Sequence, residues 1–405
     1  MKKIVYSEIK GESKGFYALL STLLVILALA LSAAWFMEHN GHHVTGMNNQ
    51  IVWGIPHVFA IFLIVAASGA LNVASIGSVF GRVAYKPLGR LSSLLAVALL
   101  VGGLAVLVLD LGRPDRILVA MFKNNFSSIF AWNIYFYVGF LAIVAVYLFV
   151  QMDYKQKKYV PTVGLFAFVW RLMLTTATGS IFGFLIAREA YDSAVMAPLF
   201  ISMSFSFGLA AFSLIILISN KATNRELGDV VINRLGKLLG LFASVVIYFT
   251  VIQHLTNLYA AEHTGVERFI LVDGGIFTLL FWLVQVVIGG FIPIALMLWP
   301  GREITRSSLL LASLLVIIGG FAQVYVIVIA GQAWPLTLFP GMEVSSSFAD
   351  GVIGSYTPSL PEILLGSGGF AITGLVVLLG IKLLRFLPES LANSVTDPHH
   401  KLPAK

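Results

Sequence analysis

The chain has 405 residues, of which 58% are hydrophobic and 11% are charged, and its mean hydropathy is +0.92. Because ordinary soluble domains carry roughly a quarter charged residues, this composition excludes a soluble protein and indicates an integral membrane protein. The absence of cysteine excludes disulfides, an iron–sulfur cluster held by this chain's own thiolates, and a haem attached through a CxxCH motif.

Apolar runs long enough to cross a bilayer, about 20 residues each, recur ten times along the chain. They cover residues 16–37, 53–80, 89–110, 128–151, 162–187, 195–219, 236–260, 271–299, 306–331 and 362–386. The alternating pattern of a membrane β-barrel does not occur. We therefore expect an all-α fold with ten transmembrane helices, forming a single polytopic membrane domain over 1–405. The polar start of the chain, with no small-residue cleavage site before the first run, is not typical of a cleavable signal peptide.

The basic residues predict the orientation in the membrane. Of the 26 Lys and Arg residues, only five fall in the outer segments if the N-terminus is inside, and Arg171 falls within a helix. The five are Arg113, Arg116, Lys123, Arg188 and Arg268. The other 20 lie on the inner side, so the positive-inside rule places both termini in the cytoplasm, with an outer loop over 332–361 and a cytoplasmic tail over 387–405. Topology thus explains the net charge of +7, and no nucleic-acid partner is expected beside the membrane lipid.

Polar residues collect at the outer ends of the predicted helices. They are His57, Asp110, Arg113, Trp132, Tyr135, Arg188, Glu189, His254 and Asp273. A single interfacial His or Tyr is usually an anchor at the headgroup level, and Asp110 could cap local backbone or pair with Arg113 or Arg116. Convergence of several such residues at one depth nevertheless favours a functional polar pocket.

Arg171 is predicted to lie near the bilayer centre, about 15 Å into its helix at 1.5 Å per residue. Charges at this depth usually face the interior of a bundle and belong to ion or proton routes. We expect a proton path through Arg171 that includes Arg188, Glu189, His254 and Asp273. The alternative is a structural arginine that binds carbonyls of neighbouring helices.

Three stretches together resemble the NrfD/PsrC family of membrane subunits, in particular its ten-helix branch with DsrP, HybB and ActC. They are "WGIPHVFAIFLIVAASGA", "DLGRPDR" and "FAWNIYFY". The resemblance implies two four-helix bundles, helices 2–5 over 53–187 and helices 6–9 over 195–331, flanked by helices 1 and 10. It implies no metal or haem in this chain.

The resemblance further implies that the chain exchanges electrons between the membrane quinone pool and an extracytoplasmic, ferredoxin-like iron–sulfur subunit. The quinone would be menaquinone or ubiquinone. Quinone would bind in the first bundle near the outer face. The residues expected to bind it are His57, Asp110, Arg113, Trp132 and Tyr135. Since quinol oxidation releases protons as well as electrons, a titratable group must lie within reach of a quinone oxygen, and His57 suits this because imidazole exchanges protons near neutral pH.

The implied setting is a respiratory complex of sulfur-compound or hydrogen metabolism in the inner (cytoplasmic) membrane of a bacterium or archaeon. In such a complex we also expect further cytochrome or catalytic subunits, and we expect electron transfer to be coupled to proton translocation. Two alternatives come from the residues. A secondary transporter would bind its substrate or coupling ion at Arg171 and the outer polar residues, although paired helix breaks near the midplane are missing. A haem-b cytochrome would need two facing histidines, for which His57 and His254 are the helix-borne candidates.

Overall fold

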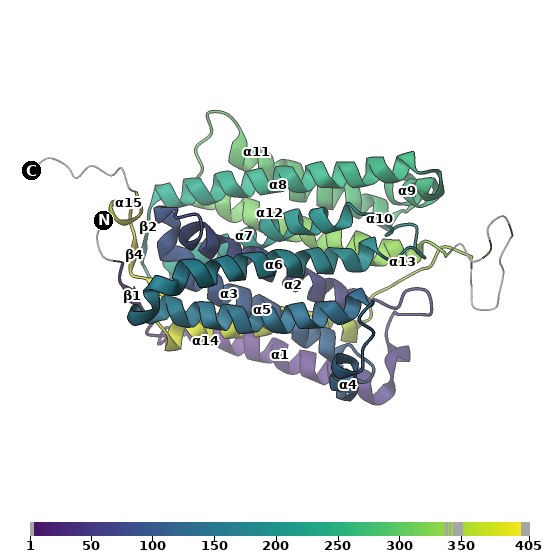
Figure 1. Ribbon diagram of the computed structural model, residues 1–405, viewed down its shortest axis with the longest axis horizontal. Helices are drawn as coiled ribbons and strands as arrows, with labels where there is room; N and C mark the ends of the chain where they lie inside the picture. The colour runs from purple at the N-terminus through teal and green to yellow at the C-terminus, as the bar shows by residue number, and fades with distance from the viewer. Residues whose placement is uncertain (1–3, 337–338, 340–341, 343–350, 398–405) are drawn as a thin grey trace, which may run out of the picture.

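A computed structural model describes residues 4–336, 339, 342 and 351–397. Long helices run side by side between two ends of the molecule (Figure 1). Within the described residues, ten helices are long and apolar enough to cross a membrane, which confirms the predicted number and the all-α class. In the described part of the chain, two pairs of short strands occur, β1 (Tyr6–Ser7) with β3 (Leu387–Pro388) and β2 (Glu226–Leu227) with β4 (Ser390–Leu391).

The membrane-spanning elements follow one another along the chain. Nine of them are α1 (Lys14–Asn40), α2 (Ile55–Ser78), α3 (Gly89–Leu109), α5 (Ile129–Met152), α6 (Val160–Gly183), α7 (Met196–Ala222), α8 (Asp229–Tyr259), α12 (Arg306–Tyr325) and α14 (Leu360–Leu383). Between α8 and α12 lies one further helix, composed of α10 (Ile276–Leu279), a π-helical stretch (Leu280–Phe291) and α11 (Ile292–Leu298). A second π-helical turn, Val326–Ala330, joins α12 to α13 (Gly331–Ala333). Short α4 (Ile117–Phe122), α9 (Thr264–Arg268) and α15 (Asn393–Thr396) lie outside these spans.

Three predicted helix boundaries were wrong by four or more residues, among them the start of the eighth helix, which was expected at 271 and lies at Ile276. The fifth helix, expected to reach residue 187, ends at Gly183, so Arg188 and Glu189 lie in the turns before α7. The seventh begins at Asp229 rather than 236. Charged residues such as Arg234 interrupt the apolar run, but they are still helical, so the helix begins before the apolar part. Asp229 stabilises its first turn, because a negative charge there interacts favourably with the positive end of the helix dipole.

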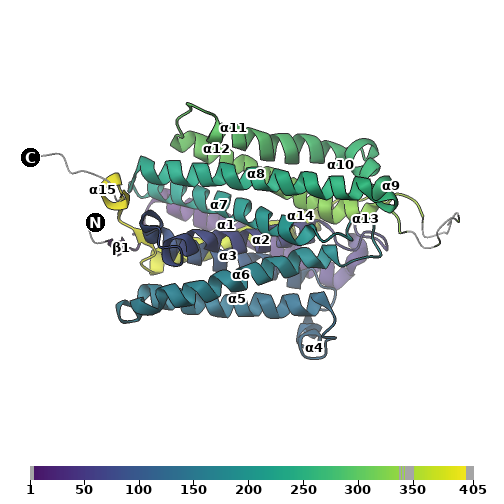
Figure 2. The same ribbon diagram turned by 45° about the horizontal axis from the view of Figure 1, so that its top comes forward.

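Helix α2 occupies the centre of the molecule. It packs against α3 and α6, which with α5 form one group of four helices, called the first bundle below, and also against α7. Helices α7, α8, α10–α11 and α12 contact one another as the second bundle, while α14 packs on α1 and α3 (Figure 2). A Cβ at Gly69 of α2 would collide with the Ser204 carbonyl oxygen of α7, so this crossing requires glycine, as close helix pairs in membranes commonly do.

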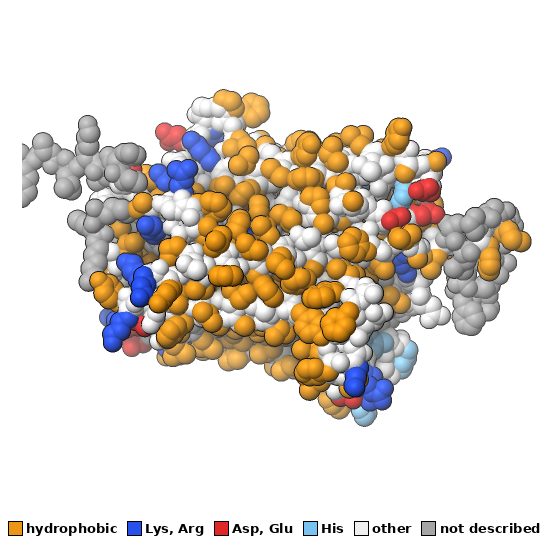
Figure 3. Space-filling view, in the orientation of Figure 1, with side chains coloured by type: hydrophobic (Ala, Val, Ile, Leu, Met, Phe, Trp, Pro, Cys, Tyr) orange, Lys and Arg blue, Asp and Glu red, His pale blue; other side chains and the backbone are white. Residues whose placement is uncertain are grey.

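The two ends of the molecule differ in charge. The described segments nearest the two termini, β1 and α15, lie at one end, where Lys and Arg side chains gather, and hydrophobic side chains cover the middle (Figures 1 and 3). The first residues of the predicted tail 387–405 are not free, because Arg225 donates hydrogen bonds to the carbonyls of Leu387 and Pro388, and of Ser7 and Glu8. Residues 398–405 of that tail, and 337–338, 340–341 and 343–350 of the predicted outer loop, lie outside the described residues. The opposite end, with α4, α9 and α13, is called the outer end below.

Candidate functional site

A histidine and a buried aspartate meet at the outer end of the first bundle. His57 lies in the first turn of α2, directly after Pro56, and Asp110 directly follows the last residue of α3. Their Nδ1 and Oδ2 atoms are 2.7 Å apart, with 15% of the His57 side chain and 1% of the Asp110 side chain exposed. The contact has the distance of an ion pair but not the angles of a hydrogen bond, and neither Asp110 oxygen has a hydrogen-bond partner among the described residues. A carboxylate buried in this way is costly unless a charge pairs with it, so the pair is suited to hold and release a proton.

One aromatic ring, that of Trp53, lies beside His57, and two further rings pack on Trp53. The ring of Trp53 stacks near the imidazole, with centroids 6.1 Å apart, and lies 5.9 Å from each of Phe130 and Phe182. Because Nδ1 of His57 faces Asp110, its Nε2 is the ring nitrogen available to a ligand. Apolar rings beside a single polar contact are typical of sites for small organic molecules. Trp53 was missed as a site residue, although it begins the first stretch that carried the family resemblance.

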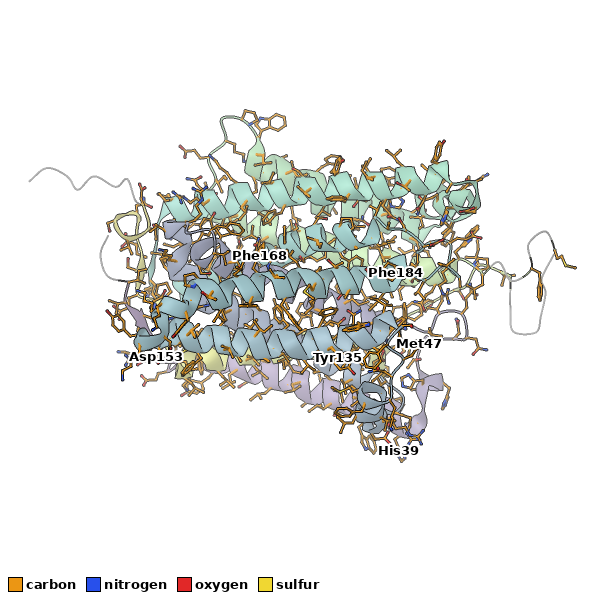
Figure 4. The ribbon with its side chains drawn as sticks, viewed as in Figure 1. His39, Met47, Tyr135, Asp153, Phe168 and Phe184 are labelled. Carbon is orange, nitrogen blue, oxygen red and sulfur yellow. The ribbon has the colours of Figure 1, made fainter. Side chains whose placement is uncertain are left out.

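The other three residues predicted to bind quinone do not contact this pair. Arg113 binds Asp115, with Nη2 and Oδ2 3.0 Å apart and both side chains about 60% exposed; the hydrogen bond to Asp115 raises the pKa of Arg113. Tyr135, at the end of α5 opposite Asp153 (Figure 4), donates to the Met121 carbonyl. Trp132 donates to the carbonyl of Phe126. Tyr135 and Trp132 therefore fasten the segment that contains α4.

A second histidine–carboxylate pair lies at the outer end of the second bundle. His254 Nδ1 on α8 is 2.6 Å from Glu267 Oε2 on α9, and only 1% of the Glu267 side chain is exposed. Asn257, one turn after His254, donates to the other Glu267 oxygen at 2.8 Å. Glu267 was missed because it falls between predicted helices, where a glutamate is normally solvated. The signal available was the pair His254 and Asn257, which share one helix face.

A cavity lined by apolar side chains and by a group of polar ones begins at this second pair, and it is called the polar cavity below. It has a volume of about 40 Å³, and a smaller cavity of about 10 Å³ continues it between α7, α8 and α12. Thr250, Gln285 and Gln323 line both. A water needs roughly 10–15 Å³ and a benzene ring about 150 Å³. The space therefore suits a few ordered waters between amide and hydroxyl groups.

Arg188, Glu189 and Asp273 lie away from this cavity. Asp273 is exposed and binds Arg268, with Oδ2 and Nε 2.7 Å apart. Arg188 donates to the carbonyls of Gln50 and Gln332, and Glu189 accepts a hydrogen bond from the indole of Trp334. Of the residues predicted for a proton path, the structure thus brings only His254 to the cavity.

Arg171 is fully buried halfway along the first bundle. Its Nη2 donates to Asn72 Oδ1 at 3.0 Å, and its guanidinium lies between the rings of Phe168 and Phe205, 4.7 and 4.9 Å from their centroids. Phe168 marks this depth on α6 in Figure 4. The Nε and Nη1 atoms have no hydrogen-bond partner within the described part of the chain. Ser206, the next residue after Phe205, lines the inner cavity, so α7 separates Arg171 from it.

These features define a polytopic membrane protein with one histidine–carboxylate pair beside aromatic rings and another beside a polar cavity. Among the described residues, no group of three or more His, Cys, Asp or Glu side chains could hold a metal ion.

The comparisons with known proteins agree with the class and establish the family. The profile described as polysulphide reductase, NrfD, matches residues 43–335, which run from just before α2 to just after α13. The chain belongs to this family, as its three characteristic stretches predicted.

Several relatives match almost the whole chain. One is the "Hdr-like menaquinol oxidoreductase integral membrane subunit" of Archaeoglobus fulgidus, which is 30% identical over 97% of this chain and 99% of its own length. A putative membrane subunit of dimethyl sulfoxide reductase from Halobacterium salinarum is 26% identical over 96% of this chain and 94% of its own. A selenate reductase subunit from Mesobacillus selenatarsenatis is 22% identical over 90% and 92%.

Proposed function

We propose that this chain is the membrane subunit of a respiratory oxidoreductase complex, in which it exchanges electrons between the quinone pool and a peripheral iron–sulfur subunit. It is a quinone-interacting subunit rather than an enzyme alone. The observation that carries the proposal is the 2.7 Å contact between His57 and the buried Asp110, beside the rings of Trp53, Phe130 and Phe182. The name of the Archaeoglobus relative makes menaquinol the first substrate to test.

The chemistry assigned to the pair is proton transfer. A quinol that is oxidised loses two electrons and two protons. The two electrons pass to the iron–sulfur subunit, and His57 Nε2 accepts the two hydroxyl protons one after the other, each being passed on before the next is taken. The Asp110 carboxylate stabilises the imidazolium formed each time, because opposite charges at this distance attract strongly where water is scarce. The exposed edge of the His57 ring then passes the proton to water at the outer end. The aromatic rings hold the quinol ring and exclude water from its other face.

Proton translocation is assigned to the second bundle. Oxidation of quinol by an outer partner moves no charge across the bilayer by itself, so energy conservation needs a route through the membrane. The polar cavity that begins at His254 and Glu267 and continues inward past Thr250, Gln285 and Gln323 supports such a route, because ordered waters between polar side chains can relay protons. Among the residues predicted earlier, His254 belongs to this route, and Arg171 is a separate candidate in the first bundle.

The iron–sulfur partner is assigned to the outer end. His57 and Asp110 lie there, whereas the basic residues gather at the end that holds β1 and α15, the described segments nearest the termini (Figure 3). With the termini in the cytoplasm, the partner is extracytoplasmic, and further cytochrome or catalytic subunits would complete the complex in the inner membrane. The family match also favours this function over that of a transporter or a haem-b cytochrome. A reduced-minus-oxidised spectrum is the direct check for haem b.

Replacing the first pair tests the quinone site. We expect His57→Ala and Asp110→Asn each to lower quinol-dependent turnover of the assembled complex by at least about tenfold, since proton transfer by a positioned side chain contributes roughly 10²–10⁴-fold. The matched control is His43→Ala, a histidine in the connection before α2, which should leave turnover unchanged. Turnover within a factor of about two of the wild type for both site variants would remove the assignment.

Proton coupling is tested at Glu267. In proteoliposomes with the full complex, Glu267→Gln should lower the proton-to-electron ratio while quinol turnover stays within about twofold, because the amide still accepts from Asn257 but no longer exchanges a proton. Glu262→Gln, an exposed change in the same connection, is the control. A ratio that falls in Arg171→Gln but not in Glu267→Gln would transfer the route to the first bundle.

Crosslinking tests the side of the partner. We expect crosslinks from the iron–sulfur subunit to reach the segment around α4 and the connection that contains α9. Crosslinks that map mainly to residues 82–90 or 221–237, at the end with β1 and α15, would contradict the proposed docking side.

A further inference from the structure

The connection that carries Trp53 is held by an amide from the second bundle. Gln332 lies on α13, and its Oε1 accepts hydrogen bonds from the backbone N–H groups of Val52 and Trp53, both at 3.0 Å. Its Nε2 donates to the Trp53 carbonyl, also at 3.0 Å. Gln332 is 1% exposed, so water does not compete for these bonds. One side chain therefore satisfies both backbone polar groups of Trp53.

A second set of contacts ties the same two segments together. Arg188 donates to the Gln332 carbonyl at 3.1 Å and to the Gln50 carbonyl at 2.9 Å. Gln50 in turn donates through Nε2 to the carbonyl of Ala333. A charged guanidinium between two carbonyls makes stronger hydrogen bonds than neutral groups do. The approach to α2, residues 50–55, is thus fixed against α13 on both sides of Gln332.

A third contact continues this arrangement to the first turn of α2. The buried Glu362 carboxylate of α14 accepts hydrogen bonds from the hydroxyl of Tyr356 and from the backbone N–H of Gly46, both at 2.8 Å. The Tyr356 oxygen accepts from the backbone N–H of Ile55 at 2.7 Å. Burial and the neighbouring Glu362 raise the pKa of Tyr356, so the hydroxyl keeps its proton and the bond to Glu362 persists. His57 follows only two residues after Ile55.

The segment that carries Gln332 also borders the cavity of the second bundle. It follows the π-helical turn Val326–Ala330, and Val326, Ile327 and Gly331 line the cavity with His254 and Glu267. π-helical turns inside α-helices are frequently found at functional sites. Neighbouring residues of one segment therefore line the polar cavity of the second bundle and contact the backbone of Trp53.

We propose that Gln332 is a positioning residue for quinol binding. It holds the backbone of Trp53 and the start of α2, and so keeps the Trp53 ring beside His57 in the geometry that accepts the quinol. This proposal rests on the function proposed above. Gln332 does not touch the quinol, and its effect is on affinity, since a displaced Trp53 ring removes one wall of the site while His57 and Asp110 keep their chemistry.

Gln332→Met tests this, because methionine has a similar length and volume but makes neither the three bonds to Val52 and Trp53 nor the bond that Gln332 Nε2 donates to the Val328 carbonyl. With menadiol as the soluble quinol, the KM should rise about tenfold, the equivalent of roughly 1.4 kcal/mol, while kcat stays within about twofold. Asn220→Leu is the matched control, since Asn220 is a buried amide near the other end of the bundle whose bond stays within α7. It should leave the KM unchanged.

Hydrogen exchange makes the test independent of catalysis. In Gln332→Met, the backbone amides of residues 50–55 should exchange at least about tenfold faster than in the wild type and in Asn220→Leu. If the methionine variant does not assemble, Gln50→Met removes only the bond to Ala333 and should raise the KM in the same direction by less. Faster exchange with no menadiol oxidation even by the wild type would contradict the proposed function while leaving the positioning of Trp53 supported. Unchanged exchange together with an unchanged KM overturns the role of Gln332.

Discussion

Burial of carboxylates in a membrane protein is the constraint on which this structure depends. Asp110 and Glu267 are each almost completely buried at the outer end, and each faces the Nδ1 atom of a histidine. An unpaired charge in such a place would cost several kcal/mol, so each carboxylate needs a partner that can become positively charged. Imidazole is the one side chain that does so reversibly near neutral pH. We propose that the same pairing that makes burial tolerable also supplies two sites for proton exchange.

We propose different uses for the two pairs because their surroundings differ. The ring of Trp53 lies beside His57, with Phe130 and Phe182 packed on Trp53, and these rings are proposed to form a wall for a planar ring. Amides, hydroxyls and a narrow cavity surround His254 and Glu267, and they provide places for water. Because α2 packs against α7 through Gly69, with no room for a side chain between them, the two sites are held in fixed relation. Gln332 adds a direct hydrogen-bonded connection between the segment lining the cavity and the backbone of Trp53.

Hydropathy alone predicted the ten spans, because each must bury about 20 apolar residues in hydrocarbon. His57, Asp110 and His254 were also found from the sequence, since polar residues at helix ends stand out in a chain with few charges. Which residues pair could not be predicted: Asp110 had Arg113 and Arg116 as nearer candidates along the chain, whereas its partner in space is His57. Glu267 and Gln332 lay in regions where polar residues are ordinary, and only tertiary packing buries them. The end of helix α6 at Gly183 could not be predicted either, because the apolar residues that follow continue the hydropathy run beyond the helix.

The position of the quinol decides how the two bundles divide their work, and we place it beside His57 in the first bundle and not in the second. A photoreactive menaquinone analogue, activated in membranes that contain the whole complex and followed by peptide mapping, tests this most directly. We expect labelling within residues 53–62, 106–111 or 130–134, with competition by unmodified menaquinol. Competed labelling concentrated in residues 250–270 instead would place the quinone in the second bundle and contradict this assignment.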